Sequence, residues 1–189
     1  MSLGVTLIRA RRFADGRGWF EESFSVARLA ALGLDHDFVQ DNLSLSLSPG
    51  TVRGLHFQRP PHAQAKLVRC VTGAVDDVVV DLRDGSPTFG QALVIRLDAE
   101  AGDQLYVPVG FAHGFITLTP DTRVAYKVSA PYAPQAEGGL AWTDPALGLG
   151  KLQVAGAILS DRDRAWSPLA QVGAPFAYDG RPMALETAA

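Results

Sequence analysis

The sequence predicts a mainly β protein folded as a single barrel or sandwich with a few short helices. Its 19 glycines and 12 prolines interrupt short β-branched runs at close intervals, which favours a sandwich or barrel over a parallel sheet. The 189 residues suit one ordinary domain, and a hydrophobic share of 47% is enough for a core. We therefore expect one domain over residues 1–189, with an N-terminal strand arm and a C-terminal tail of loops and short helix.

The clearest elements follow one another between turn signals. Thr72-Gly73 and Pro120-Asp121 are turn signals between pairs of expected strands. A helix is expected at Val26–Leu32, because Ser25 can cap its N-terminus and Gly33 can end it in the left-handed conformation. The tail from residue 131 predicts a long ordered loop, with a short helix near 161–166 and frayed residues at 183–189. The expected strands include Ala65–Val71, Ala74–Leu82, Gly90–Asp98, Gln104–Val107, Gly114–Leu118 and Thr122–Ser129.

Two polar side chains fall on apolar strand faces. Tyr126 alternates onto the face that carries Val124 and Val128, so its ring is expected inside the barrel with a partner for its hydroxyl. Lys66 shares a face with apolar neighbours of its own strand, which is unusual for a lysine. Taken alone, Lys66 could equally be an edge residue whose ammonium reaches water.

Composition and charge exclude several classes of protein. A charged share of 20% and a net charge of −3 argue against disorder and against a nucleic-acid binder working by bulk positive charge. An anionic small ligand remains possible through local Arg and Lys side chains. Cys70 is the only cysteine, so no internal disulfide can form. No apolar run has membrane or signal-peptide length, so a cytoplasmic protein with no membrane partner is expected.

Three stretches carry residues capable of chemistry: 53–58 leading to Lys66, 108–114, and 159–164. The spacing of Gly102, Pro108, Gly110 and His113 matches the second half of a cupin signature, in which the histidine usually binds a metal. The first half should supply His-x-His and a glutamate, but this chain has His56-Phe57-Gln58.

Metal binding is therefore not expected. A site made of His56, His62 and His113 stays open as an alternative, although it would lack the usual cupin ligands. The fourth histidine, His36, lies in a polar segment and is expected to be solvated, while His62 reads as a loop residue near the entrance.

Several motifs along the chain stand out together: RGLHFQRPPHAQAKLVRCVTGAV, DLRDGSPTFGQ, LYVPVGFAHGFITL, LSDRD, FVQDN and AWTDPALGL. They resemble the motifs of the dTDP-4-dehydrorhamnose 3,5-epimerase family. The resemblance extends from about Arg17 to about Asp163 and is specific for the superfamily, less so for one substrate. Two departures are Asp76, where the family commonly has an aromatic residue, and Ala65, which replaces a usual glycine.

The resemblance implies a cupin-type jelly-roll barrel, usually a homodimer that exchanges N-terminal strands. It also implies catalysis without metal or cofactor. Such enzymes convert dTDP-4-keto-6-deoxyglucose, a dTDP-sugar, to the L-rhamnose-configured ketone by inverting C3 and C5.

Four catalytic residues follow from the family match. His56 suits the base that removes a proton beside the ketone, because neutral imidazole is abundant near physiological pH. Asp163 would pair with it and fix its tautomer. Lys66 would lie near the enolate oxygen, and Tyr126 would return a proton from the opposite face. Alone, Asp163 would read as a surface charge between two arginines.

The match also supplies binding residues. Arginine suits a diphosphate because its hydrogen bonds are bidentate and charge-assisted. His113 could instead be a structural support of the pocket, and Trp19, Trp142 and Trp166 are most simply packing residues. The positions expected to hold the nucleotide are Arg17, Glu22, Gln40, Asp41, Asn42 and Arg53, and those around the diphosphate and sugar are His113, Glu137 and Arg162.

Three alternatives remain open on sequence alone. A 3-epimerase of another deoxysugar pathway would share the same residues and differ only in stereochemical outcome. A metal-dependent cupin oxygenase would retain a stoichiometric metal after purification. A non-catalytic sugar-nucleotide-binding cupin should tolerate loss of the catalytic set, yet His56, Lys66, Tyr126 and Asp163 are all present.

Overall fold

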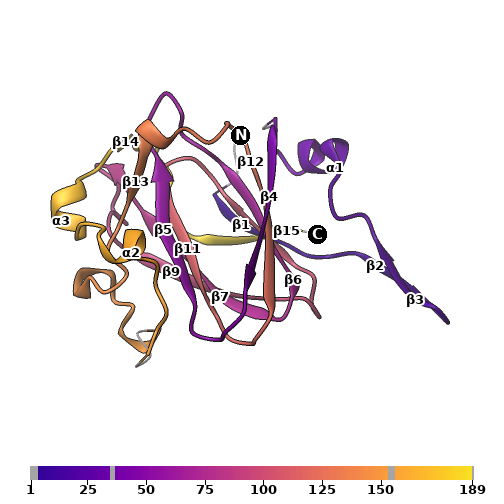
Figure 1. The fold of residues 1–189 in the computed structure, drawn as a ribbon. Coiled ribbons are helices and arrows are strands. Elements are labelled where there is room, and N and C mark those ends of the chain that lie inside the picture. Colours follow the sequence, from indigo (N-terminus) through magenta and orange to yellow (C-terminus); the bar gives the residue numbers. More distant parts are fainter. Residues whose placement is uncertain (1–3, 35–36, 153–155, 189) are drawn as a thin grey trace.

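Two β-sheets face each other in the computed structural model of the chain, which describes residues 4–34, 37–152 and 156–188 (Figure 1). The six-stranded sheet has the order β15 (Leu185–Ala188), β1 (Val5–Ile8), β10 (Gln104–Val107), β6 (Lys66–Thr72), β12 (Thr122–Val128) and β4 (Gln40–Ser46). The five-stranded sheet has the order β13 (Glu137–Gly139), β5 (Val52–Gln58), β11 (Phe111–Thr117), β7 (Ala74–Asp81) and β9 (Ala92–Asp98).

Smaller elements surround the two sheets. Two short strand pairs join β14 (Phe176–Ala177) to β8 (Arg83–Asp84) and β2 (Arg12–Asp15) to β3 (Gly18–Glu21). The α-helices are α1 (Val26–Ala31), α2 (Asp161–Arg164) and α3 (Leu169–Val172). Turns of 3₁₀ helix occur at Pro134–Ala136, Pro145–Leu147 and Gly150–Leu152. No helix among the described residues is long and apolar enough to cross a membrane.

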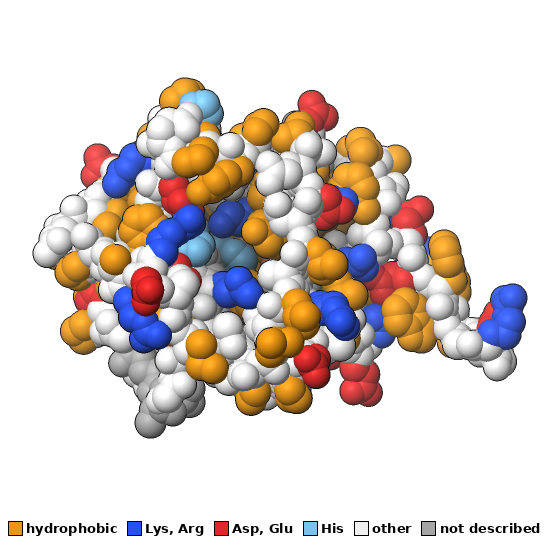
Figure 2. Space-filling view, in the orientation of Figure 1, with side chains coloured by type: hydrophobic (Ala, Val, Ile, Leu, Met, Phe, Trp, Pro, Cys, Tyr) orange, Lys and Arg blue, Asp and Glu red, His pale blue; other side chains and the backbone are white. Residues whose placement is uncertain are grey.

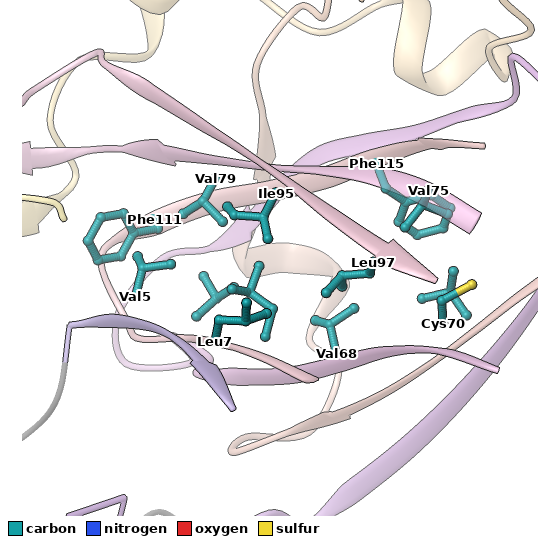
Figure 3. Packing of buried hydrophobic residues seen from close by; sticks show 13 residues of the cluster. Val5, Leu7, Val68, Cys70, Val75, Val79, Ile95, Leu97, Phe111 and Phe115 are labelled. Atoms are coloured by element: carbon teal, nitrogen blue, oxygen red, sulfur yellow. The ribbon is translucent and has the colours of Figure 1, made fainter. Parts of the chain in front are cut away.

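The main hydrophobic core fills the space between the sheets (Figure 3). Val68 from β6 points toward Val75 and Val79 from β7, and Phe111 from β11 closes one end of the cluster. All four side chains are at most 5% exposed. Alternation along each strand places these residues on one face, because successive side chains point to opposite sides of a sheet.

Two further clusters lie on the outer faces of the sheets. Val78 and Val80, on the other face of β7, pack with Leu140, Trp142 and more of the C-terminal segment. On the outer face of the six-stranded sheet, the side chain of Leu29 from α1 is buried in a third cluster with β-strand residues. The C-terminal segment is therefore part of a packed layer over the five-stranded sheet.

The predicted fold class is confirmed, and most expected strands lie within one or two residues of their predicted bounds. Strand β10 has the expected bounds, whereas β11 begins at Phe111, three residues before its predicted start. Helix α1 is capped as expected: the Arg28 amide donates to Ser25 Oγ at 3.3 Å, and Gly33 has φ +78°. His36 lies outside the described residues.

The prediction of a frayed C-terminus is wrong. Residues 185–188 form β15, which pairs in parallel with β1 along the edge of the six-stranded sheet. Upstream, Arg83 is buried and bonds Asp179 at 2.8 Å, and the Met183 amide donates to Thr88 Oγ1. This tail is held by a strand partner almost the whole chain away, which a local pattern cannot show.

The β2–β3 hairpin extends away from both sheets (Figure 1). Phe13, Trp19 and Phe20 on it are 52%, 58% and 69% exposed. The Arg12 guanidinium lies 3.8 Å from the centre of the Trp19 ring. Trp19 is thus not a core residue within a single chain, contrary to its expected role in packing, whereas Trp142 is buried.

Candidate active site

A cavity of about 490 Å³ opens between the two sheets. Figure 2 shows histidine side chains at the bottom of a hollow with Lys and Arg side chains around it. Both sheets and α2 contribute lining side chains. Eight of the thirteen predicted site residues line it, namely His56, Lys66, Tyr126, Asp163, Arg53, His113, Glu137 and Arg162.

His56 and Asp163 form a hydrogen-bonded pair in this cavity. His56 Nε2 lies 2.5 Å from Asp163 Oδ1, and their side chains are 28% and 7% exposed. Burial acts to raise the pKa of Asp163, but the hydrogen bond and charge of His56 outweigh it and hold the pKa below its usual range. Asp163 is therefore an ionised partner of the imidazole, and its interpretation as a surface charge is wrong.

Local structure fixes both members of the pair. His56 projects from β5, and Asp163 lies in the single turn of α2, where Ser160 Oγ accepts a hydrogen bond from the Asp163 amide at 3.1 Å. A serine before the first turn and acidic residues within it suit a helix N-terminus. The Trp166 ring packs edge-on against His56 with centroids 6.0 Å apart. Asp163 and Trp166 thus hold the imidazole from one side of the cavity.

The opposite wall carries Lys66 and Tyr126, from neighbouring strands of the six-stranded sheet. Lys66 is only 8% exposed, so it does not reach bulk water as an edge lysine would. Burial lowers the pKa of Lys66 to about 8, and the charges of Asp77 and Glu137 partly oppose this shift. Burial raises the pKa of Tyr126, which keeps its hydroxyl protonated at neutral pH.

A second histidine–carboxylate pair lies deeper. His113 Nε2 is 2.9 Å from both carboxylate oxygens of Asp77, which is fully buried on β7. His113 is also the direct cross-strand partner of His56. Burial raises the pKa of Asp77, and the charge and hydrogen bond of His113 oppose the rise.

Charged side chains surround the mouth of the cavity. Arg162 pairs with Glu137, and Tyr132 donates a hydrogen bond to Glu137 Oε2 at 3.0 Å. Arg53 is held by Ser46 Oγ at 3.1 Å and by the Leu45 carbonyl. The mouth therefore presents two guanidinium groups, the side chains best suited to a diphosphate.

Five predicted binding residues do not line the cavity. Gln40 and Asn42 share the inward face of β4 and bond each other at 2.8 Å, and Gln40 also accepts from the Tyr132 amide. Asp41 faces outward and pairs with Lys127. Arg17, at the tip of the projecting hairpin, pairs with Asp15 of the same hairpin, and Glu22 is exposed just after it.

The structure adds residues that sequence reasoning missed. Asp77 sits within a valine-rich strand, Trp166 follows α2, and Tyr132 lies in the loop after β12. Strand alternation would have put Asp77 on the same face as Val75 and Val79, which is the one available signal. In the part of the chain that is described, no group of three or more His, Cys, Asp or Glu side chains is arranged to hold a metal ion.

The fold and the cavity define a cupin-type β-sandwich whose pocket is built for acid–base chemistry. The sequence profile of dTDP-4-dehydrorhamnose 3,5-epimerase matches residues 3–171. The chain belongs to this family.

Relatives and solved structures agree with the assignment. A dTDP-4-dehydrorhamnose 3,5-epimerase of Sinorhizobium fredii is 49% identical over 92% of this chain and 89% of its own. The 3,5-epimerase of Legionella pneumophila, solved with dTDP-4-keto-L-rhamnose, superposes with a TM-score of 0.86 at 39% identity, covering 92% and 93% of the two chains. The 3′-monoepimerase ChmJ of Streptomyces bikiniensis, solved with dTDP-quinovose, has a TM-score of 0.83 at 36% identity, covering 93% and 90%.

Proposed function

We propose that this protein epimerises C3 and C5 of dTDP-4-keto-6-deoxyglucose through enolate intermediates, giving the L-rhamnose-configured ketone. Family membership and the 49% identity to a 3,5-epimerase support this activity. So does the similarity to a 3,5-epimerase solved with dTDP-4-keto-L-rhamnose. The observation that carries the mechanism is that His56, paired with Asp163, and Tyr126 come from opposite sheets and line one cavity.

His56 is the proposed base. The C4 ketone acidifies the hydrogens on C3 and C5, and the imidazole takes one of them as the electron pair moves into the enolate. Asp163 accepts a hydrogen bond from Nε2, which leaves Nδ1 as the nitrogen that takes the proton. The resulting imidazolium faces an ionised carboxylate, which lowers the free energy of the charged state.

Tyr126 is the proposed acid. Its hydroxyl donates a proton to the enolate carbon from the wall opposite His56, so the new C–H bond forms on the other face of the ring. Water then returns a proton to the phenolate, and the imidazolium releases its own. Because burial raises the pKa of Tyr126, the phenol is in its protonated form before each step.

Lys66 is the proposed group that stabilises the negative charge developing on the ketone oxygen. A buried ammonium directed at a forming enolate is worth more than the same group in water, because the surroundings screen it less. Arg53 and Arg162 at the mouth suit the diphosphate, with Glu137 orienting Arg162. Contacts with the nucleoside are assigned to Gln40 and Asn42 on β4, and the hydrogen bond of Gln40 with the Tyr132 amide, next to the cavity, supports this assignment.

A homodimer is part of this proposal. Arg17 and Glu22 lie on or beside a hairpin that extends away from its own cavity, and apolar Phe13, Trp19 and Phe20 are exposed on it. The outer edge strand β4 exposes apolar side chains as well, Leu43 and Leu45, and Leu47 directly after the strand is also exposed. The exposed apolar side chains of the hairpin are explained if it packs on a second copy of the chain. In that position it would carry Arg17 and Glu22 to the partner's cavity.

A second candidate is a 3-epimerase that inverts C3 alone. The structural similarity to ChmJ favours it, because that protein is a 3′-monoepimerase with a TM-score of 0.83. The sequence identity to ChmJ, 36%, is lower than the 49% identity to a 3,5-epimerase. The 3,5-epimerase is therefore the preferred proposal.

Proton exchange at the two carbons tests both candidates. The protein is incubated with dTDP-4-keto-6-deoxyglucose in D₂O, and C3 and C5 are followed by NMR. Deuterium at both carbons with an L-configured product supports the 3,5-epimerase. Exchange at C3 alone supports the 3-epimerase, and exchange at neither carbon rejects both.

A further inference from the structure

Lys66 has an unusual environment for a buried ammonium. Among the described residues it makes no ion pair within 4.0 Å, and its ammonium donates a hydrogen bond to the His56 carbonyl at 3.3 Å. An isolated buried charge is costly unless a countercharge compensates it. A countercharge in direct contact would, however, occupy the N–H groups that an enolate oxygen needs.

Asp77 meets both requirements. It is a fully buried carboxylate on β7, and its two oxygens are bonded to His113 rather than to Lys66. Its charge still acts on Lys66 through the poorly screened interior, and it is the strongest of the charges that favour the ammonium form. Because His113 Nε2 lies 2.9 Å from both carboxylate oxygens, Asp77 can act on Lys66 through its charge without a direct hydrogen bond.

We infer that Asp77 is a positioning residue of the epimerisation, the countercharge that keeps Lys66 an ammonium while His113 holds the carboxylate away from it. The inference rests on the proposed function, in which Lys66 faces the enolate oxygen. Asp77 itself touches no substrate, because His113 lies between it and the cavity. Its effect on catalysis is carried by the protonation state of Lys66.

Other groups around the cavity also act on Lys66. Glu137 favours the ammonium less strongly than Asp77 does, and it is already engaged with Arg162 and Tyr132 at the mouth. The remaining titratable or charged groups that line the cavity are Arg53 and His56 of β5, His113 of β11, Tyr126 of β12 and Asp163 of α2. Glu137 is the other carboxylate whose charge acts on Lys66. Substitution of Asp77 alone therefore removes the larger of the two contributions to the Lys66 pKa.

The test compares Asp77→Asn with a matched control, Asp76→Asn. The two carboxylates are neighbours on β7 but face opposite sides, since Asp76 lines a separate cavity with Ile116 and Lys151. Loss of a nearby countercharge lowers a lysine pKa by about one unit or more. Starting from a Lys66 pKa of about 8, kcat should fall about fivefold at pH 8 and less than about twofold at pH 6.5.

Three readouts separate this effect from general damage. In Asp77→Asn the alkaline limb of the kcat profile moves to lower pH, while KM and the affinity for dTDP, measured by calorimetry, stay unchanged. Asp76→Asn keeps the wild-type profile. A loss of kcat that is equal at pH 6.5 and pH 8, or a rise in KM alone, overturns the inference.

A direct titration decides the matter if Asp77→Asn does not fold or the wild type shows no epimerisation. Carbon-13 NMR of the wild-type protein reports the Lys66 side chain and the Asp77 carboxyl separately. The inference expects Asp77 ionised at pH 7 and Lys66 losing its proton near pH 8. An Asp77 carboxyl that stays protonated throughout pH 6–9 carries no countercharge and overturns it, whatever the substrate.

Discussion

Two histidine–carboxylate pairs, one lining the cavity and one reaching behind its wall, differ mainly in burial. His56 and His113 face each other on neighbouring strands, and each has a carboxylate within 3 Å of Nε2. The His56 side chain is 28% exposed and the His113 side chain 7% exposed. Asp163 approaches from a one-turn helix that covers the barrel, whereas Asp77 belongs to a central strand.

This difference in burial shifts the pKa values of the two carboxylates in opposite directions, although each is paired with a histidine. In the open pair the His56 interaction outweighs burial and lowers the pKa of Asp163, so the carboxylate is always available to an imidazolium. In the sealed pair burial dominates and raises the pKa of Asp77. In the proposed mechanism the His56–Asp163 pair exchanges protons with the substrate, whereas the buried Asp77 carboxylate acts only as a countercharge, which requires that His113 and Lys66 keep it ionised against the effect of burial.

The largest effect is expected for the open pair. His56→Ala removes the proposed base, so kcat should fall about 10²- to 10⁴-fold with little change in affinity for dTDP. Steady-state epimerisation and calorimetry measure the two quantities. His62→Ala is the matched control, because His62 lies in the loop after β5 and contributes its backbone carbonyl to Gln58. A fully active His56→Ala protein would mean that another base operates.

A smaller and more selective effect is expected on the opposite wall. Tyr126→Phe removes the proposed acid but leaves the base, so deuterium exchange should continue while inversion slows about 10- to 100-fold. NMR of one sample in D₂O gives both rates. Tyr178→Phe, whose ring lies 5.3 Å from the Arg83 guanidinium outside the cavity, serves as control. Equal loss of exchange and inversion would contradict a role limited to reprotonation.

The contrast between the two pairs also marks what the sequence could predict. His56 and Lys66 lie in one continuous motif, and Tyr126 falls on an apolar strand face by simple alternation. Asp163 was assigned by resemblance alone. Asp77 was missed, because an aspartate followed by three valines has the same local pattern whether its carboxylate is buried or solvated.

Distant pairings set a similar limit on the fold. Strand β10 was predicted with its observed bounds because turn residues precede it and a proline follows it. Strand β15 was missed because its partner β1 is at the other end of the chain, and no pattern within 183–189 encodes that contact. The projecting hairpin has no core of its own in one chain, so Trp19, which was expected to be a packing residue, is exposed there.

Lys66 links the two pairs and should limit stability. Its folded pKa of about 8 lies below the unfolded value of about 10.4, so the penalty on the folded state grows as pH falls from about 10 to 8 and is fully present below pH 8. Lys66→Met should remove this penalty, raising the free energy of unfolding at pH 7 by about 3 kcal/mol and Tm by about 6–12 °C while lowering kcat. The gain should shrink above pH 8 and vanish near pH 10. Thermal melts across this range measure it, and a lower Tm at pH 7 would show that Lys66 stabilises the fold.

The smallest effect is expected for Arg17, which in the proposed dimer lies in the partner's cavity and not in that of its own chain. In the proposed dimer, a hybrid of a His56→Ala subunit and an Arg17→Ala subunit has one cavity with an intact His56 and an intact partner hairpin. Such a hybrid, isolated with two affinity tags, should regain about half the wild-type activity per dimer. Activity is measured with substrate below KM, where the loss of a charged contact in Arg17→Ala should lower the rate about 10-fold or more. A hybrid no more active than the average of its parents would place Arg17 beside its own cavity or outside the site. Each cavity would then be formed by the residues of one chain alone.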